Sequence, residues 1–323
     1  MANDAYALPG QPRWLELDTF NLTLPFGWED EAAGLRGHLF ASSDNATLVL
    51  SIKGTSIDGP LPPKGRSTAR LDQVNDNLFF SCCCGTLPSD VCSCKAPFGG
   101  PLGRKRKTCD EGCLAEGLFG PESYYPEAVA LLAQVRVHYP TADIWLVGHS
   151  LGGVVAGLLG LTFGLPAVTF EAPPDALVVG RLGLRVPRVE ANPVTHVFHT
   201  GDMIATGACR GPLSACGRGG YSMESSCKQG NLRVYDTVAK WGWSVDRTGR
   251  SHTIQWVIGA SFRCSAVSKA PSTLLRYRHG HDADSRPLPA DNVYSKPWNN
   301  GEIEGPEGRG RDWTYVWFCL SSG

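Results

Sequence analysis

The segment that most constrains this chain is a glycine-rich turn, Gly-His-Ser-Leu-Gly-Gly, at residues 148–153. A largely apolar run precedes it at residues 143–147, and a second apolar run, rich in small residues, follows at 154–161. This order predicts a strand, a tight turn and a helix, with Ser150 at the turn. Glycine permits the strained backbone of such a turn and close packing of the helix on the strand. The Ser150 hydroxyl is then held out at the end of a sheet.

The bare Gly-x-Ser-x-Gly pattern is weak evidence, because a chain with 38 glycines in 323 residues produces it readily by chance. The sixth residue, Gly153, and the position between a strand pattern and a helix pattern make the signal specific. A glycine-rich turn whose serine only caps the helix would have the same pattern without the chemistry. The context favours Ser150 as a nucleophile, with the backbone N–H of Leu151 as one donor to a developing oxyanion.

A serine nucleophile needs a base and an acid that orients the base, and α/β-hydrolases carry them in the order serine, acid, histidine. Asp202 comes just past a strand-like run that starts at residue 194, and His252 lies just before an apolar segment. The order rule therefore favours Asp202 as the acid and His252 as the base. Asp236 lies within a strand-like run, residues 232–238, and is expected to face solvent. Further histidines and acids after Ser150 compete for the same two roles: His196, His199, His279, His281, Asp175 and Asp246.

A second oxyanion donor usually comes from a loop after an earlier strand. Residues 46–55 read as such a strand and end in Gly54 and Thr55. Thr55 offers both a backbone N–H and a hydroxyl, so it is the candidate second donor. An ordinary turn between strand and loop would also explain this segment.

Strand and helix patterns alternate between residues 47 and 258, which predicts an α/β fold with a largely parallel sheet. Residues 127–139 predict a helix before the nucleophile strand, because apolar residues recur there at helical spacing. A length of 323 residues with 42% hydrophobic content suffices for one large core. We expect one domain at residues 1–264, with a cysteine-rich excursion at 82–113. Residues 265–323 read as a polar tail whose apolar end can dock on the core.

The net charge of −1 gives no indication of nucleic-acid binding, and the proposed chemistry requires no metal or organic cofactor. The 12 cysteines lie at spacings that match zinc modules poorly, and their number is even. Two glycosylation sequons begin at Asn21 and Asn45. These features together predict disulfides and a secretory or vacuolar compartment, with a pairing that the sequence does not reveal.

Several stretches beyond the turn resemble one family of proteins: residues 25–29, 34–38, 51–56, 74–85, 142–153, 158–166, 168–173 and 219–225. Together they resemble the class 3 lipases and, within them, the autophagy-related vacuolar lipase family of fungi. The resemblance extends from about residue 20 to about residue 258. It is specific, because the Asn-Asp-Asn and triple-cysteine segments within 74–85 are not general lipase features.

The resemblance implies an α/β-hydrolase fold of the class 3 lipase type and hydrolysis of glycerolipid esters, including phospholipids. It implies the nucleophile at Ser150, the acid at Asp202 and the base at His252, with Thr55 as an oxyanion donor by the general class pattern. It also implies phospholipid membranes as the substrate and breakdown of autophagic-body membranes in the vacuole lumen, reached through the secretory and endosomal route. Class 3 lipases carry a lid after the oxyanion strand, which corresponds here to residues 56–71.

The chain departs from the family pattern at three places. Met203 stands where the family usually has a proline after the acid. The family carries an N-terminal hydrophobic anchor, whereas no run here approaches the ~18 apolar residues that span a bilayer. We therefore expect a luminal fragment of a membrane-anchored protein, or a gene model without the anchor. Residues after about 265 match nothing in the family.

Two further functions remain open from the sequence: a lipase-like protein that binds lipid without turnover, and a soluble esterase of non-lipid esters. The first would misplace Asp202 or His252. The second would show no rise in activity at a lipid–water interface. Residues 104–107, Arg-Lys-Arg-Lys, are either a contact with anionic lipid head groups or a solvated loop. Oligomeric state cannot be read from the sequence.

Overall fold

The computed structural model describes residues 1–29, 34–56, 68–81, 111–211, 213–221, 223–259 and 318–319. Most of the expected lid, the cysteine-rich excursion up to residue 110, the basic run at 104–107, and both His279 and His281 lie outside these ranges. The predictions for these segments therefore stay predictions.

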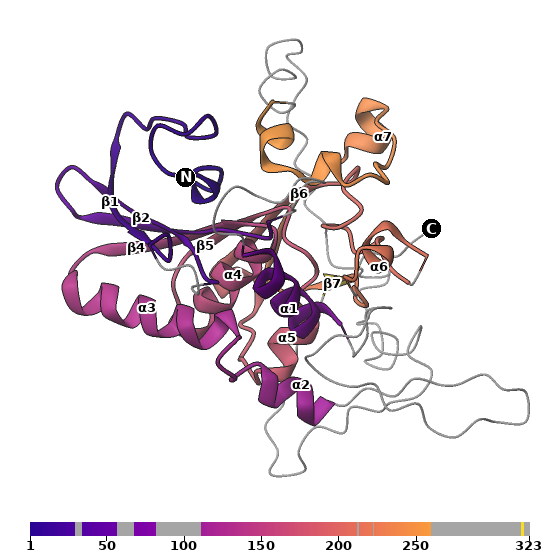
Figure 1. Ribbon diagram of the computed structural model, residues 1–323, viewed down its shortest axis with the longest axis horizontal. Coiled ribbons are helices and arrows are strands. Elements are labelled where there is room, and N and C mark those ends of the chain that lie inside the picture. Colours follow the sequence, from indigo (N-terminus) through magenta and orange to yellow (C-terminus); the bar gives the residue numbers. More distant parts are fainter. Residues whose placement is uncertain are drawn as a thin grey trace, which may run out of the picture.

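The fold is built on a seven-stranded sheet with the order β1-β2-β3-β4-β5-β6-β8 (Figure 1). The first three strands pair antiparallel, and every pair from β3 to β8 is parallel. The strands are β1 (Phe20–Phe26), β2 (Gly37–Ser42), β3 (Thr47–Ile52), β4 (Asp143–His149), β5 (Ala167–Phe170), β6 (Val194–His199) and β8 (Asn231–Tyr235). This largely parallel sheet with helical crossovers confirms the predicted α/β-hydrolase fold.

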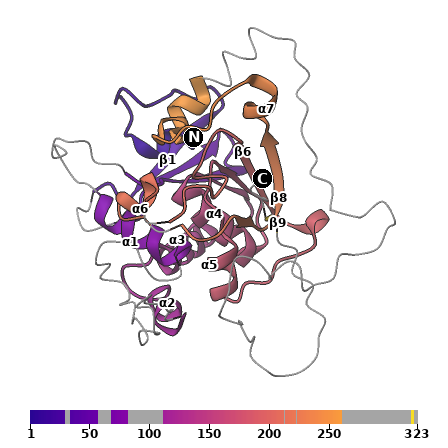
Figure 2. The same cartoon turned by 90° about the vertical axis from the view of Figure 1, so that its right-hand side faces the viewer.

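Helices cover the sheet, and short helical turns fill the connections between strands. The α-helices are α1 (Ala69–Phe80), α2 (Glu111–Gly117), α3 (Tyr124–His138), α4 (Leu151–Phe163), α5 (Ala176–Arg181), α6 (Ala215–Arg218) and α7 (Thr237–Trp241). The 3₁₀ turns are η1 (Asp4–Tyr6), η2 (Val189–Ala191) and η3 (Arg250–His252). In Figure 1, α3, α4 and α5 lie below the sheet, whereas the N-terminal segment and α7 lie above it; Figure 2 shows the same layers after a quarter turn.

Helix α4 is the centre of the core. It contacts β3, β4, β5 and β6, and α3 packs against its outer side. Ten of its thirteen residues are buried, because its glycines and small side chains allow close approach to the strands. The core around it is apolar and includes Leu48, Leu50, Ile52, Leu132, Leu146, Val154, Val155, Leu158, Leu159 and Val194.

Helix α3 confirms the helix predicted before the nucleophile strand. It begins at Tyr124, three residues before the predicted start, because the Ser123 side chain caps it by accepting a hydrogen bond from the Tyr125 N–H. Ala128, Leu132 and Val135 are its buried stripe, as the spacing predicts.

The parallel register aligns the carboxyl ends of the strands at one edge of the sheet. Ile52 of β3 pairs with Gly148 of β4, and His149 of β4 pairs with Phe170 of β5. Ligand sites of open α/β sheets lie at this edge, outside the carboxyl ends of the strands. The loops after β3, β4 and β6 therefore converge, and they carry Thr55, Ser150 and Asp202, whereas His252 lies on η3, which follows β8 and α7.

Four cysteines among the described residues are disulfide-bonded, which confirms the predicted disulfides at these positions. Cys209 and Cys216 are joined to each other, with their Cα atoms 5.8 Å apart, and Cys113 and Cys227 are also in disulfides. Both sequon asparagines, Asn21 and Asn45, have exposed side chains. Their glycosylation stays a prediction.

The chain's last described residues lie beside a short strand of the domain. Phe318–Cys319 form β9, whose backbone pairs antiparallel with β7 (Cys227–Lys228). The domain boundary at residue 264 stays a prediction. In the described part of the chain, no helix combines the length and the apolar character that crossing a membrane requires.

Candidate active site

The turn after β4 has the strained geometry that the sequence predicts. Ser150 has φ 57° and ψ −131°, a backbone conformation that residues other than glycine rarely adopt. A Cβ on Gly148 would lie 2.2 Å from the carbonyl oxygen of Gly152, and a Cβ on Gly152 would lie 2.3 Å from the carbonyl oxygen of Ile52. Only glycine fits at both positions, so the turn can be this tight and can bring α4 against the sheet.

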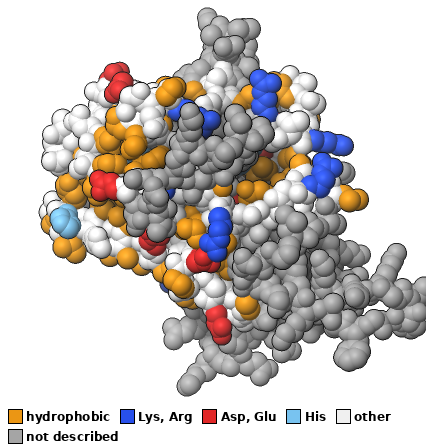
Figure 3. Space-filling model, in the orientation of Figure 1, with side chains coloured by type: hydrophobic (Ala, Val, Ile, Leu, Met, Phe, Trp, Pro, Cys, Tyr) orange, Lys and Arg blue, Asp and Glu red, His pale blue; other side chains and the backbone are white. Residues whose placement is uncertain are grey.

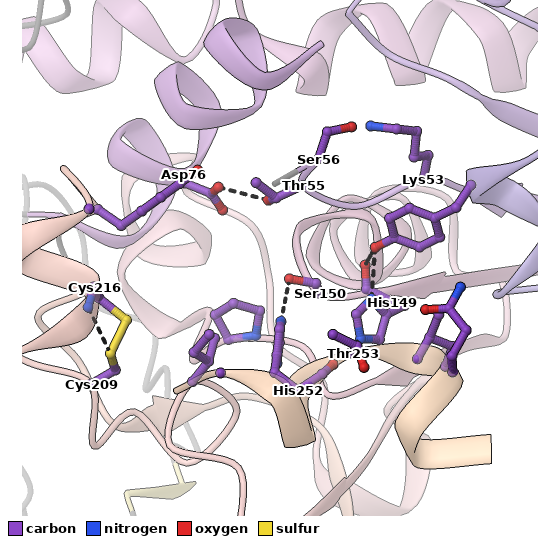
Figure 4. Close-up of a pocket in the computed structure, with 18 of the residues that line it drawn as sticks. Lys53, Thr55, Ser56, Asp76, His149, Ser150, Cys209, Cys216, His252 and Thr253 are labelled. Carbon is purple, nitrogen blue, oxygen red and sulfur yellow. Dashed lines mark hydrogen bonds between the residues drawn. A yellow bond between two sulfur atoms is a disulfide. The ribbon is translucent and has the colours of Figure 1, made fainter. Parts of the chain in front are cut away.

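The structure brings Ser150, His252 and Asp202 into one hydrogen-bonded chain. The Ser150 hydroxyl lies 2.8 Å from His252 Nε2 (Figure 4), and His252 Nδ1 lies 2.7 Å from Asp202 Oδ2. The turn after β4 supplies Ser150, the loop after β6 supplies Asp202, and η3 supplies His252. All three side chains are buried. This is the geometry in which a histidine takes a proton from a serine while a carboxylate fixes its tautomer.

The acid of this chain is held in its ionised form. Burial opposes the charge of Asp202, but the nearby His252 and its hydrogen bond hold the pKa of Asp202 below its ordinary value. Oδ1 of Asp202 also accepts a hydrogen bond from the Ile204 N–H at 2.8 Å. Glu171 lies beside it, fully buried, with φ 46°. Burial and the charge of Asp202 raise the pKa of Glu171 well above its ordinary value, and a side-chain hydrogen bond to Asp202 acts in the same direction.

Thr55 lies at the pocket that Ser150 lines, just past the end of β3. Its hydroxyl donates a hydrogen bond of 2.8 Å to Oδ2 of Asp76, a buried residue of α1 (Figure 4). Leu151 is the first residue of α4, so its N–H is one that a helix leaves without an intrahelical acceptor. The positions of Thr55 and Leu151 allow the predicted oxyanion role, which stays a prediction.

Tyr6 and His149 support the backbone of the candidate base, and no sequence pattern selects either of them for this role. The His149 Nε2–H donates to the carbonyl oxygen of His252 at 2.7 Å. Since Nε2 carries the hydrogen, Nδ1 of a neutral His149 is an acceptor, and the Tyr6 hydroxyl lies 2.7 Å from it. Burial and the charge of His252 lower the pKa of His149 to about 3, so the imidazole stays neutral in ordinary buffers. The N-terminal segment thus fixes the position of His252 through one buried imidazole.

We expect Tyr6→Phe to lower kcat roughly fivefold, because losing one hydrogen bond costs about 1 kcal/mol in the orientation of His252. KM for a short-chain ester should change little, since the ring that lines the pocket remains. The loss should be constant from pH 5 to pH 8, because His149 does not titrate in that range. Initial rates across this range measure it.

Tyr125→Phe is the matched control for this change. The Tyr125 hydroxyl also has one side-chain partner, Thr162 Oγ1 at 2.9 Å, but it lies on α3. If both variants lose the same activity, the Tyr6 hydroxyl has no particular connection to the base.

The other described candidates for the base and the acid have structural partners. His196 lies 2.8 Å from the Thr169 hydroxyl through Nδ1, and His199 Nε2 lies 3.1 Å from the Ser251 carbonyl oxygen. Asp175 accepts two hydrogen bonds from Gln229. Asp246 accepts hydrogen bonds from Thr248 and from the Ser251 N–H, so it anchors the loop that carries His252.

The interpretation of Asp236 as a strand residue is wrong. Strand β8 ends at Tyr235, and Asp236 is the N-cap of α7. Its side chain accepts a hydrogen bond of 3.1 Å from the Ala239 N–H. Capping of this kind ends the strand pattern, because the side chain satisfies a free N–H of the first helical turn.

A cavity of about 810 Å³ lies at Ser150 and has a mixed lining. Its apolar lining residues include Phe80, Pro173, Met203, Ile204, Tyr221 and Met223. Its polar lining residues include Tyr6, Gln11, Arg13, Arg36, Lys53 and Asp76. Such a cavity accommodates a substrate with a long apolar part and a polar part.

Two curated proteins show high similarity to this chain. "Putative lipase ATG15" of Cryptococcus neoformans var. neoformans serotype D (strain B-3501A) is 45% identical over 264 residues, which are 80% of this chain and 49% of that protein. The protein of the same name from Mycosarcoma maydis is 41% identical over 256 residues, 76% of this chain and 47% of its own length. The chain spans about half the length of the curated relatives it matches.

The Lip2 lipase of Yarrowia lipolytica is a similar solved structure, with 19% identity, a TM-score of 0.37 and coverage of 73% of this chain and 75% of its own. No protein-family model matches the chain. The two curated relatives, by contrast, match most of this chain's length at high identity. The chain belongs to the family of fungal lipases named ATG15.

Proposed function

We propose that this chain hydrolyses carboxylic esters of glycerolipids, with phospholipids as its substrates. The observation that carries the proposal is the Ser150–His252–Asp202 chain at the wall of a cavity whose lining includes both apolar and cationic residues. The apolar lining suits an acyl chain, and Arg13 and Arg36 suit the phosphate of a head group. The names of the relatives support lipase activity.

In this mechanism, His252 Nε2 takes the proton of Ser150 while Oγ attacks the ester carbonyl. The Leu151 N–H and Thr55 hold the oxyanion of the tetrahedral intermediate. His252 then passes the proton to the leaving alcohol, and water, activated by the same imidazole, releases the fatty acid from Ser150. Asp202 stays ionised throughout and stabilises the imidazolium.

We further propose that the protein acts in the vacuole lumen on the membranes of autophagic bodies, reached through the secretory and endosomal route. The disulfides support an oxidising compartment, and the exposed sequon asparagines suit a secretory route. The relatives are about twice as long as the region they share with this chain, so a membrane anchor in the full-length form is part of the proposal.

The test is hydrolysis of phosphatidylcholine and phosphatidylserine vesicles by the purified chain, with the released lipids identified by mass spectrometry. We expect free fatty acid and lysophospholipid in equal amounts at first, and none with Ser150→Ala. A triacylglycerol emulsion and a short-chain chromogenic ester are the comparison substrates. Turnover of the short-chain ester alone would favour a soluble esterase, and vesicle binding without turnover of any ester would favour a lipid-binding protein.

A further inference from the structure

The loop closed by the Cys209–Cys216 disulfide carries the most exposed large apolar side chain among the described residues. Leu213 is 85% exposed, whereas Cys209 and Cys216 at the base of the loop are buried in the main hydrophobic core. An isolated exposed leucine needs no explanation in itself. Leu213 differs from such an isolated residue in three ways: its loop is constrained, the loop is positively charged, and the loop lines the catalytic cavity.

The loop is held in shape by several contacts besides the disulfide. The Ser214 hydroxyl donates to the Gly211 carbonyl oxygen at 2.8 Å and accepts from the Gly217 N–H at 3.0 Å, which caps α6. The Cys209 N–H donates to the Met203 carbonyl oxygen at 2.9 Å. Leu213 thus stands on a preorganised loop and stays directed away from the core, so binding through it costs little ordering entropy.

This loop forms part of the wall of the catalytic cavity. Cys209, Ala215 and Cys216 line the same cavity as Ser150, and Figure 4 shows the disulfide at one end of the pocket with Ser150 further in. A surface that receives Leu213 is therefore held close to the wall of the catalytic cavity.

The charged side chains in the segment that carries Leu213 have one sign. Residues 203–223 contain two arginines, Arg210 and Arg218, and no acidic residue. Within the part of the chain that the structure describes, neither guanidinium has a hydrogen bond or an ion pair. An apolar side chain between two unpaired cations suits an anionic bilayer, where the leucine enters the acyl region and the arginines contact head groups.

We propose that Leu213, flanked in the chain by Arg210 and Arg218, docks the protein on anionic lipid bilayers and presents the catalytic cavity to them. The proposal rests on the proposed function in one respect: the docked surface is the one that supplies the substrate. It differs from the contact expected at residues 104–107, because the segment that carries Leu213 also lines the cavity of Ser150, through Cys209, Ala215 and Cys216.

The test measures binding without turnover, in the full chain with Ser150→Ala. Flotation with phosphatidylcholine vesicles, with and without phosphatidylserine, gives the bound fraction. We expect Leu213→Ser to weaken binding to phosphatidylserine-containing vesicles about tenfold. The double change Arg210→Gln and Arg218→Gln should weaken binding only where phosphatidylserine is present, and its effect should vanish at about 1 M salt.

Val137→Ser is the matched control. Val137 is 77% exposed and lies on α3, which is on the opposite side of the molecule from α6 in Figure 1. Hydrophobic side chains are also scattered over the face drawn in Figure 3, so a control for general loss of surface hydrophobicity is needed. Binding by this variant should equal that of the parent chain. Unfolding midpoints of all variants should agree, since each altered side chain is at the surface or without a described polar partner.

Equal binding by the Leu213→Ser and Val137→Ser variants would overturn the proposal. So would a Leu213→Ser chain that sediments as a smaller particle than the parent, because Leu213 would then lie between two copies of the chain. Binding is measured without a nucleophile, so it is independent of whether phospholipid is hydrolysed. Intact binding without turnover would contradict the proposed function. Intact turnover with binding that does not depend on Leu213 would contradict the proposed docking surface.

Discussion

Ser150→Ala is expected to lower kcat for a short-chain ester by about 10⁶-fold, the loss typical when a serine hydrolase loses its nucleophile. The reason is that the covalent route is closed: no second described hydroxyl lies within hydrogen-bond distance of His252 Nε2. Residual hydrolysis above the rate in water is expected, because the oxyanion donors and the cavity remain. Initial-rate kinetics over several hours of incubation measure this effect.

Two controls make this result specific. The unfolding midpoint of the variant should stay near that of the parent, since alanine keeps the Cβ of Ser150, with the same backbone strain, and adds no volume. Ser214→Ala removes a hydroxyl next to Ala215, which lines the cavity, and should leave kcat within about twofold, because this hydroxyl bonds only to Gly211 and Gly217 of its own loop among the described residues. Comparable losses at both serines would contradict a nucleophilic role for Ser150.

Asp202→Asn is expected to lower kcat by about 10⁴-fold while the fold stays intact. An asparagine amide that donates to His252 Nδ1 stabilises the tautomer with hydrogen on Nε2, and this tautomer cannot accept the Ser150 proton. The lost negative charge also removes the partner of the imidazolium. The variant should regain part of its activity at high pH, where hydroxide replaces the missing base. A pH–rate profile of kcat measures both effects.

Asp236→Asn is the matched change, since asparagine caps a helix as well as aspartate does. It should keep kcat within about twofold of the parent. Asp246→Asn would be a poorer control, because Asp246 accepts a hydrogen bond of 2.6 Å from the Ser251 N–H and so holds the segment of His252. A loss at Asp236→Asn that matches the loss at Asp202→Asn would show that the acid is assigned to the wrong loop.

Ser150, Asp202 and His252 are predictable from the sequence, because the first follows from a local pattern and the other two follow from their order in the chain. A strand pattern, glycines and a helix pattern fix the geometry of Ser150 over a dozen residues. Asp202 and His252 follow from chain order, and the parallel register then brings their loops to one edge of the sheet. The contact itself joins residues 102 positions apart, so only the fold could show the distance.

Tyr6, Asp76, His149 and Glu171 could not be selected in the same way. Tyr6 lies on a segment without a strand or helix pattern, and it contacts His149 across 143 positions of the chain. Asp76 lies on α1 between two asparagines, and an acidic residue in such polar surroundings gives no sign that it will be buried against Thr55. Glu171 shows its unusual state only through burial beside Asp202, and burial of a carboxylate is a tertiary property.

The end of β8 shows how a local signal can mislead. Residues 232–238 alternate as a strand does, but the capping hydrogen bond of Asp236 ends the strand at Tyr235 and starts α7. The competing principle is helix capping, which needs only one side chain and three following residues. An aspartate inside a strand-like run is itself a sign of such a boundary, because aspartate is depleted in strands.

The most direct test of the central claim is the site of covalent labelling by a fluorophosphonate, read by mass spectrometry of the intact protein and of its peptides. We expect one adduct per chain, on the peptide that contains Ser150, with labelling greatly slowed by Asp202→Asn and absent in Ser150→Ala. An adduct on another residue of the native chain, or undiminished labelling of Ser150→Ala, would contradict the account.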